Sequence, residues 1–147
     1  MLWLIVILAI LAVMSIKVLY EYERGVVFTL GKFSGVVGPG LVLIIPIIQT
    51  MRKVDLRITT VDIPRQAIMT KDNVPVTINA VVYFRVERPA DAVLKIKDYT
   101  YTVMQYTFAA LRDQLGDYEL DFILTQREKI AEDLKKTVDK ETDEWGI

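Results

Sequence analysis

The chain contains neither histidine nor cysteine. Without imidazole and thiol groups it has no histidine general base, no thiol nucleophile, no disulfide and no Cys/His zinc site. The glycines between residues 31 and 40 are not followed by Gly-Lys-Ser/Thr, so they do not form a phosphate-binding loop of the P-loop type. Catalysis would then have to rest on carboxylates, lysines or hydroxyls, and no catalytic constellation of these residues stands out. We expect a protein that is not an enzyme and that uses no cofactor and no metal.

The amino-terminal run lacks helix breakers and contains one charged residue, Lys17. Residues 2–19 contain no Gly or Pro, and Ser15 and Lys17 are their only polar residues. These 18 residues would reach roughly 27 Å as a helix, close to the hydrocarbon thickness of a bilayer. A cleaved signal peptide and a core helix are the alternatives. A signal peptide fits poorly, because this run has no basic residues before it and no small-residue cleavage site after it. We predict a single-pass transmembrane anchor over residues 1–21, with these membrane-embedded residues: Leu2, Trp3, Leu4, Ile5, Val6, Ile7, Leu8, Ala9, Ile10, Leu11, Ala12, Val13, Met14, Ile16, Val18 and Leu19.

A second apolar segment, residues 40–48, is too short to span a bilayer as a helix. Pro46 cannot donate a ladder hydrogen bond, so a core strand would end there. The alternative is a loop that enters the membrane interface, with basic residues meeting lipid headgroups at its exit. Both interpretations fit the sequence. The predicted interfacial loop comprises Leu41, Val42, Leu43, Ile44, Ile45, Pro46, Ile47 and Ile48, and the predicted headgroup contacts are Lys17, Arg52 and Lys53.

The rest of the chain shows strand patterns first and helix patterns later, which indicates an α+β fold. Residues 54–63 read as a strand with a bulge near Thr59 and Thr60, closed by Pro64. Residues 74–86 alternate apolar and polar side chains, which predicts a long half-buried strand in an antiparallel sheet.

Three helices are expected after the strands. One begins at Pro89, one covers 99–115 and stops at Gly116, and one covers 124–144. Asp117, Glu119 and Asp121 could be a metal or acid–base cluster, but acidic residues around a helix start are the more ordinary interpretation.

Charge is distributed unevenly along the chain. Residues 24–97 carry 11 basic and 5 acidic side chains, whereas residues 98–147 carry 6 basic and 12 acidic ones. A positive membrane-proximal half suits an anionic lipid surface. The basic residues are not clustered with aromatics, so nucleic acid is not an expected partner.

The carboxyl-terminal residues resemble the signature of the stomatin family, within the stomatin/prohibitin/flotillin (SPFH, band 7) superfamily. The upstream segments Glu23–Phe28, 38–46, 72–86 and 110–121 resemble the rest of the family pattern in order. The residues that match the signature are Arg127, Ile130, Ala131, Val138, Asp139, Thr142, Trp145, Gly146 and Ile147.

This resemblance implies an SPFH domain over residues 22–147, with an antiparallel sheet and flanking helices. It also implies a non-catalytic membrane scaffold that forms homo-oligomers, organises a membrane microdomain, and binds membrane proteases or channels. The alternative is a regulatory subunit of a single membrane protease or channel that forms no array. The family pattern continues into a coiled coil, so we expect the chain to be truncated before that element and its oligomer to be weakened. We expect it in a membrane, specifically a prokaryotic plasma membrane; the residues do not fix the side on which the domain lies.

Overall fold

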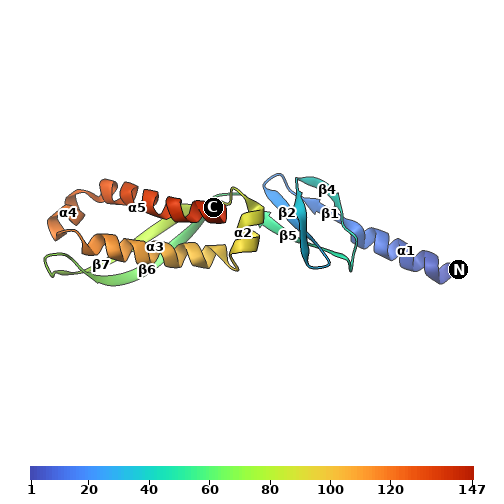
Figure 1. Ribbon diagram of the computed structural model, residues 1–147, viewed down its shortest axis with the longest axis horizontal. Coiled ribbons are helices and arrows are strands. Elements are labelled where there is room, and N and C mark those ends of the chain that lie inside the picture. Colours follow the sequence, from blue (N-terminus) through green and yellow to red (C-terminus); the bar gives the residue numbers. More distant parts are fainter. The chain divides into compact units, whose positions relative to one another are not determined.

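A computed structural model describes all residues of the chain, Met1–Ile147 (Figure 1). The chain divides into two compact units. Unit 1 comprises Met1–Arg57 with Val86–Ala90, and unit 2 comprises Ile58–Arg85 with Asp91–Ile147. Each unit mixes regular elements with short connections, and all strand pairing is antiparallel.

Unit 1 begins with the apolar helix α1, Leu2–Ser15, which runs directly into strand β1, Ile16–Leu19. The helix predicted to continue through Leu19 is therefore wrong in its last four residues. Ile16 already has an extended backbone, with φ −84° and ψ 121°. The reason is tertiary: β1 pairs along its whole length with β4, Gly40–Leu43, and this pairing overrides the helical continuation of the run.

The other strands of unit 1 form a three-stranded sheet in the order β3–β2–β5. Strand β2 covers Glu23–Thr29, β3 covers Lys32–Val37 and β5 covers Gln49–Asp55. The central strand supplies the best-buried side chain, Val26, and β5 supplies Val54. Strand β2 is therefore the centre of this sheet.

Unit 2 consists of one long hairpin and a set of helices. The hairpin strands are β6, Thr59–Met69, and β7, Pro75–Phe84. The helices are α2, Pro89–Lys95 (most of which lies in unit 2), α3, Tyr99–Gly116, α4, Leu120–Thr125, and α5, Arg127–Thr142, followed by a short 3₁₀ turn, Asp143–Trp145.

The hairpin and helices of unit 2 share one apolar core. The inward face of β7 alternates as the sequence predicts, and it packs against α3 and α5. Helix α3 begins at Asp98, whose side chain accepts a hydrogen bond from the backbone N–H of Tyr101. Its buried stripe repeats every four residues, which places it on one side of the helix. The core consists of Ile68, Leu111, Leu115, Ile130 and Leu134.

Two strand predictions require correction. The strand expected over residues 54–63 is two strands: β5 ends at Asp55, and β6 begins at Thr59 in the other unit. Pro64 does not close β6, because the strand continues to Met69, and the irregularity lies between Ile63 and Gln66 rather than at Thr59. Both strands of this sheet are edge strands, where a proline at a bulge is tolerated.

The predicted helices lie close to their expected bounds. The expected helix 124–144 corresponds to α5, and its first two residues belong to the separate short helix α4, because Gln126 leaves the helical region with φ −117° and ψ 40°. Gly116 lies inside α3, and Asp117 caps the helix end instead. The sheet predicted as one antiparallel layer is three small sheets of two, three and two strands.

Candidate membrane-contact surface

Helix α1 exposes apolar side chains on every side. None of its residues is buried, and its exposed residues include Trp3, Leu8 and Val13. A helix that is apolar all round requires an apolar surrounding on all sides, unlike an amphipathic helix with one buried stripe. No helix in the structure combines the length and the apolar character needed to cross a bilayer.

The carboxyl end of α1 is fastened to the predicted interfacial segment. The hydroxyl of Ser15 donates to the backbone carbonyl of Ile44, and the backbone N–H of Ile44 donates to the Ser15 carbonyl at 2.8 Å. Ile44 itself is buried. Helix α1 and the segment that follows β4 are therefore joined by two hydrogen bonds at one point.

The segment 41–48 matches neither sequence interpretation completely. A core strand ending at Pro46 is wrong, because β4 ends at Leu43 and a turn begins at Pro46. The side chains of Leu41, Leu43 and Ile45 are exposed rather than packed in the core. A short exposed strand followed by an apolar turn retains the character of an interfacial loop, which stays a prediction.

A second exposed turn lies beside this loop. Leu30 and Gly31 connect β2 to β3, and the backbone N–H of Leu30 donates to the carbonyl of Ile48 at 2.8 Å. The side chain of Gln49 links the two turns. Its amide nitrogen donates to the Thr29 hydroxyl at 3.3 Å, and its amide oxygen accepts from the backbone N–H of Ile45 at 3.1 Å.

The sequence patterns singled out neither Leu30 nor Gln49. The signal that could have found Leu30 is its place before a glycine between two strands, where Asn or Asp is the usual residue of a two-residue hairpin turn. No sequence signal marks Gln49, because its two partners are set by the pairing of β5 with β2.

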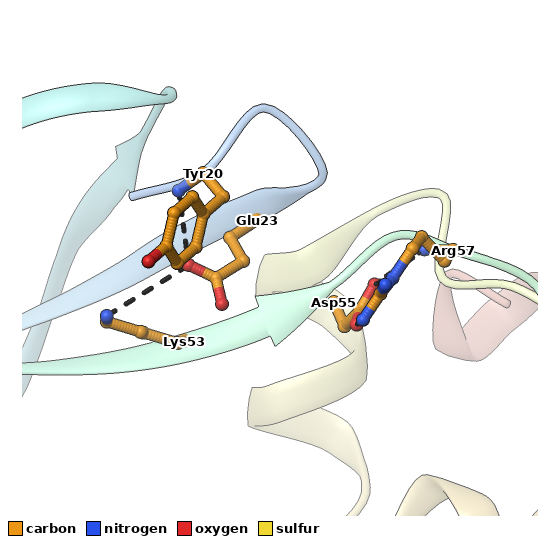
Figure 2. Close-up of polar contacts among 5 residues, drawn as sticks. All are labelled: Tyr20, Glu23, Lys53, Asp55 and Arg57. Carbon is orange, nitrogen blue, oxygen red and sulfur yellow. Dashed lines mark hydrogen bonds and ion pairs between the residues drawn. The ribbon is translucent and has the colours of Figure 1, made fainter. Parts of the chain in front are cut away.

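Of the predicted headgroup contacts, Lys53 already interacts with groups of the protein itself (Figure 2). Its ammonium lies 4.0 Å from the Glu23 carboxylate and donates to the backbone carbonyl of Val18 at 3.1 Å. The same Glu23 carboxylate accepts from the backbone N–H of Tyr20 at 3.2 Å. Lys53 thus ties β5 to β1 and β2, and its role at headgroups stays untested. Lys17 and Arg52 are exposed, with Lys17 on β1 rather than in a helical turn.

Near the end of β5, aromatic and charged side chains of unit 1 form a cluster. Arg57 forms a two-pronged ion pair with Asp55, with 2.7 Å between Nη2 and Oδ2, and its guanidinium lies 4.0 Å from the centre of the Tyr22 ring. Hydrogen bonds from the side chain of Arg57 hold the pKa of Asp55 below its usual range. The Tyr22 ring stacks on Tyr20, so these residues form one packed group.

The acidic residues near α4 have structural positions. Glu119 is the residue before α4 and Asp121 lies in its first turn, where the helix dipole favours negative charge. Asp72, from the β6–β7 turn, accepts from the backbone N–H of Leu120 at 3.3 Å. No group of three or more carboxylates is placed to hold a metal ion.

The signature residues at the carboxyl end gather around α5. Ile130 lies in the core of unit 2, and the Thr142 hydroxyl donates to the Val138 carbonyl at 3.0 Å. Trp145 packs edge-to-face on Tyr106 of α3, with ring centres 6.0 Å apart. These contacts give Ile130, Thr142 and Trp145 a role in packing. The remaining signature residues are Arg127, Ala131 and Asp139, exposed on α5, and Gly146, which has φ 76° in a left-handed turn before Ile147.

Comparison with known proteins agrees with this architecture. Residues 17–147 match the family model described as SPFH domain / Band 7 family. The chain is 47% identical over 133 residues to a stomatin homologue of Pyrococcus horikoshii, covering 90% of this chain and 50% of that protein. It is 45% identical over 144 residues to an uncharacterized protein of Archaeoglobus fulgidus, covering 98% of this chain and 58% of the relative.

An animal relative shows the same partial coverage. Stomatin-1 of Caenorhabditis elegans is 42% identical over 135 residues, covering 91% of this chain and 41% of that protein. The chain therefore spans about half the length of the curated relatives named here. Family membership suggests a membrane-associated scaffold or regulator, and proteins of this family are generally non-catalytic. The chain belongs to the SPFH domain / Band 7 family and is a stomatin-like member of it.

Proposed function

We propose that this chain is a non-catalytic scaffold that attaches to a membrane through α1, associates with copies of itself, and modulates membrane proteases or channels. The observation that carries the membrane part is the exposure of α1, none of whose apolar side chains is buried. Lipid surrounds a helix evenly, whereas a protein partner covers one stripe of it.

Charge supports the same attachment. From Gly25 to Val54 the chain has no acidic residue, but it has three basic ones, Lys32, Arg52 and Lys53, of which Lys53 lies 4.0 Å from the Glu23 carboxylate. This stretch includes the whole segment that is fastened to the end of α1 at Ser15. An anionic lipid surface attracts each nearby basic residue by about 1 kcal/mol. A single-pass anchor over residues 1–21 and an interfacial loop over 41–48 are the finer form of this proposal.

Flotation with lipid vesicles tests the attachment. The chain should float with vesicles of phosphatidylcholine and phosphatidylglycerol and should resist a carbonate wash. A charge in the middle of a lipid-embedded helix costs about 2.5–3.5 kcal/mol, so Leu8→Asp should release most of the chain. Leu124→Asp is the matched control, because Leu124 is an exposed leucine of unit 2. Equal flotation of both variants, or wild type that washes off, would contradict the proposal.

Self-association is proposed on the opposite charges of the two halves of the sequence. A basic surface of one copy that meets an acidic surface of the next makes a head-to-tail contact, which closes into a ring when the rotation permits. The exposed acidic residues around the start of α4 are candidates for the acidic side: Asp117, Glu119 and Asp121.

Chemical cross-linking at low and high salt tests this contact. Cross-linked oligomers should decrease as salt rises, because exposed charge pairs are screened. The double variant Glu119→Lys with Asp121→Lys should lose them at low salt. Asp62→Lys, an equally exposed change on β6, should retain them. Association that is independent of salt would count against charge pairing, and a one-to-one complex with a membrane protein in detergent would favour the regulatory-subunit alternative.

A further inference from the structure

Two apolar residues of unit 1 occupy backbone conformations that ordinary side chains avoid. Leu30 has φ 50° and Ile47 has φ 76°. For an L-residue the left-handed region brings Cβ close to the backbone oxygen, and a β-branched residue such as Ile is a particularly poor occupant. Both side chains are also turned to solvent: Leu30 is 81% exposed and Ile47 is 92% exposed.

The stability of the isolated chain does not explain why Leu30 and Ile47 occupy these positions. Leu30 and Gly31, with φ 50° and 81°, are the two central residues of the β2–β3 hairpin, and both have positive φ as in a type I′ turn. Asn-Gly is the favoured pair for that turn, because Asn tolerates the left-handed region and is soluble. Leucine adds backbone strain and exposes apolar surface at once. Strain at such positions is retained where it serves another purpose.

Hydrogen bonds connect the Leu30–Gly31 turn to the turn that begins at Pro46. The Leu30 N–H bonds to the Ile48 carbonyl, and the side chain of Gln49 bonds to both the β2 end and the Ile45 N–H. The backbone N–H of Gln49 also donates to the Ile45 carbonyl at 2.8 Å. We name the group Leu30, Ile45, Ile47 and Ile48 the apolar tip. All four side chains are exposed.

We infer that the apolar tip, with Leu30 as a full member, inserts into the lipid bilayer, and that Gln49 is the residue that positions its two turns. This inference rests on the proposed membrane attachment and extends it to a turn outside the segment 41–48. Two observations favour lipid over another protein. The tip adjoins Ser15 at the end of the all-round apolar α1, and Lys32, directly after the Leu30 turn, lies in a stretch without acidic residues.

Spin labels test the insertion, since the chain has no cysteine and a single introduced one is labelled uniquely. Labels would be attached to Leu30→Cys, Ile47→Cys and Glu21→Cys in vesicles of phosphatidylcholine and phosphatidylglycerol. Glu21 is exposed and lies in the turn before β2, whereas Leu30 follows β2, so the two residues flank opposite ends of that strand. The labels at Leu30 and Ile47 should collide several-fold more with oxygen than with a water-soluble nickel complex, and the label at Glu21 should show the reverse.

A second variant separates strain from insertion. Leu30→Asn should raise the thermal midpoint of the chain, because Asn suits the turn, and it should move the label at Ile47 to a shallower depth. Leu124→Asn, an exposed leucine on α4, should do neither.

Each outcome has a distinct meaning. A chain that floats with vesicles while the label at Leu30 stays in water overturns the inference and leaves the attachment standing. A label at Leu30 that is shielded from both oxygen and nickel indicates a second copy or another protein at the tip, and this also overturns it. A chain that does not float at all overturns the proposed function and the inference together.

Discussion

Thr107→Val should stabilise unit 2, because the hydroxyl of Thr107 is a buried polar group without a partner. Thr107 is 4% exposed on the inward stripe of α3, between Val103 and Leu111, and its Oγ1 makes no hydrogen bond. Leaving a buried polar group unsatisfied costs about 1–3 kcal/mol. Valine has nearly the same shape and branching, so the change removes the hydroxyl without opening a cavity.

The magnitude follows from the size of the unit. Unit 2 contains roughly 85 residues, and about 1 kcal/mol moves the melting temperature of a domain of that size by about 4–8 °C. Thermal unfolding followed by tryptophan fluorescence in a Trp3→Phe background reports on this unit, because the remaining tryptophan, Trp145, packs on Tyr106 of α3. The melting temperature of Thr107→Val should therefore rise by several degrees.

Thr142→Val is the matched control. Thr142 is equally buried on a helix, at 5% exposed, but its hydroxyl donates to the Val138 carbonyl. Its replacement should leave the melting temperature unchanged or lower it by the worth of one hydrogen bond, about 0.5–1.5 kcal/mol. If both valine variants melt lower than wild type, the Thr107 hydroxyl has a partner and the reasoning is refuted.

Three further changes test other parts of the fold. A hydrogen bond from the Thr70 hydroxyl is the main cause that lowers the pKa of Asp72 below its usual 3.8. The ionised carboxylate therefore stabilises the fold above pH 3.8, and this contribution is lost as the pH falls through the lowered pKa. Asp72→Asn should be less stable than wild type at neutral pH, and the difference in stability should disappear as the pH falls from 3.8 through the lowered pKa. Asp98→Ala removes the cap of α3 and should cost about 1 kcal/mol in chemical denaturation, with faster amide exchange in the first turn of the helix. Gly25→Ala would place a Cβ 2.4 Å from the sulfur of Met51 and 2.8 Å from Cγ2 of Val37, so it should destabilise unit 1; the double variant with Met51→Ala should recover only part of the loss, because the contact with Val37 remains.

The elements of unit 2 were largely predictable because their signals are local. One stretch of sequence is enough to read each of three signals: the period-two alternation of 74–86, Pro89 in the first turn of α2, and the apolar stripe at every fourth residue of α3. The division of residues 54–63 between two units was not predictable in this way. Val54, Ile58 and Ile63 are all apolar, and only the pairing of β5 with β2 and of β6 with β7 separates them.

The candidate site was predictable in its apolar character and not in its geometry. Hydropathy marks residues 2–19 and 41–48 without ambiguity. It does not show that Lys53 is occupied by Glu23 and Val18, since these contacts depend on the register of β5 against β2. Exposed apolar residues with positive φ, such as Leu30, are also invisible to hydropathy, because backbone conformation is set by the hairpin and not by the side chain.

The end of α1 at Ser15 illustrates how tertiary contacts decide between two structures for one sequence. Residues 16–19 have no local helix breaker, but the β-branched side chains of Ile16 and Val18 lower helix propensity and favour a strand. Strand β4 offers these four residues backbone partners, and Ser15 extends the ladder by accepting from the Ile44 N–H while its hydroxyl donates to the Ile44 carbonyl. A helical continuation would leave the β4 backbone and Ile44 without these partners, and Leu19 would lose its buried place in unit 1. The strand therefore prevails because it satisfies the backbone of two segments at once, whereas a longer helix satisfies only one.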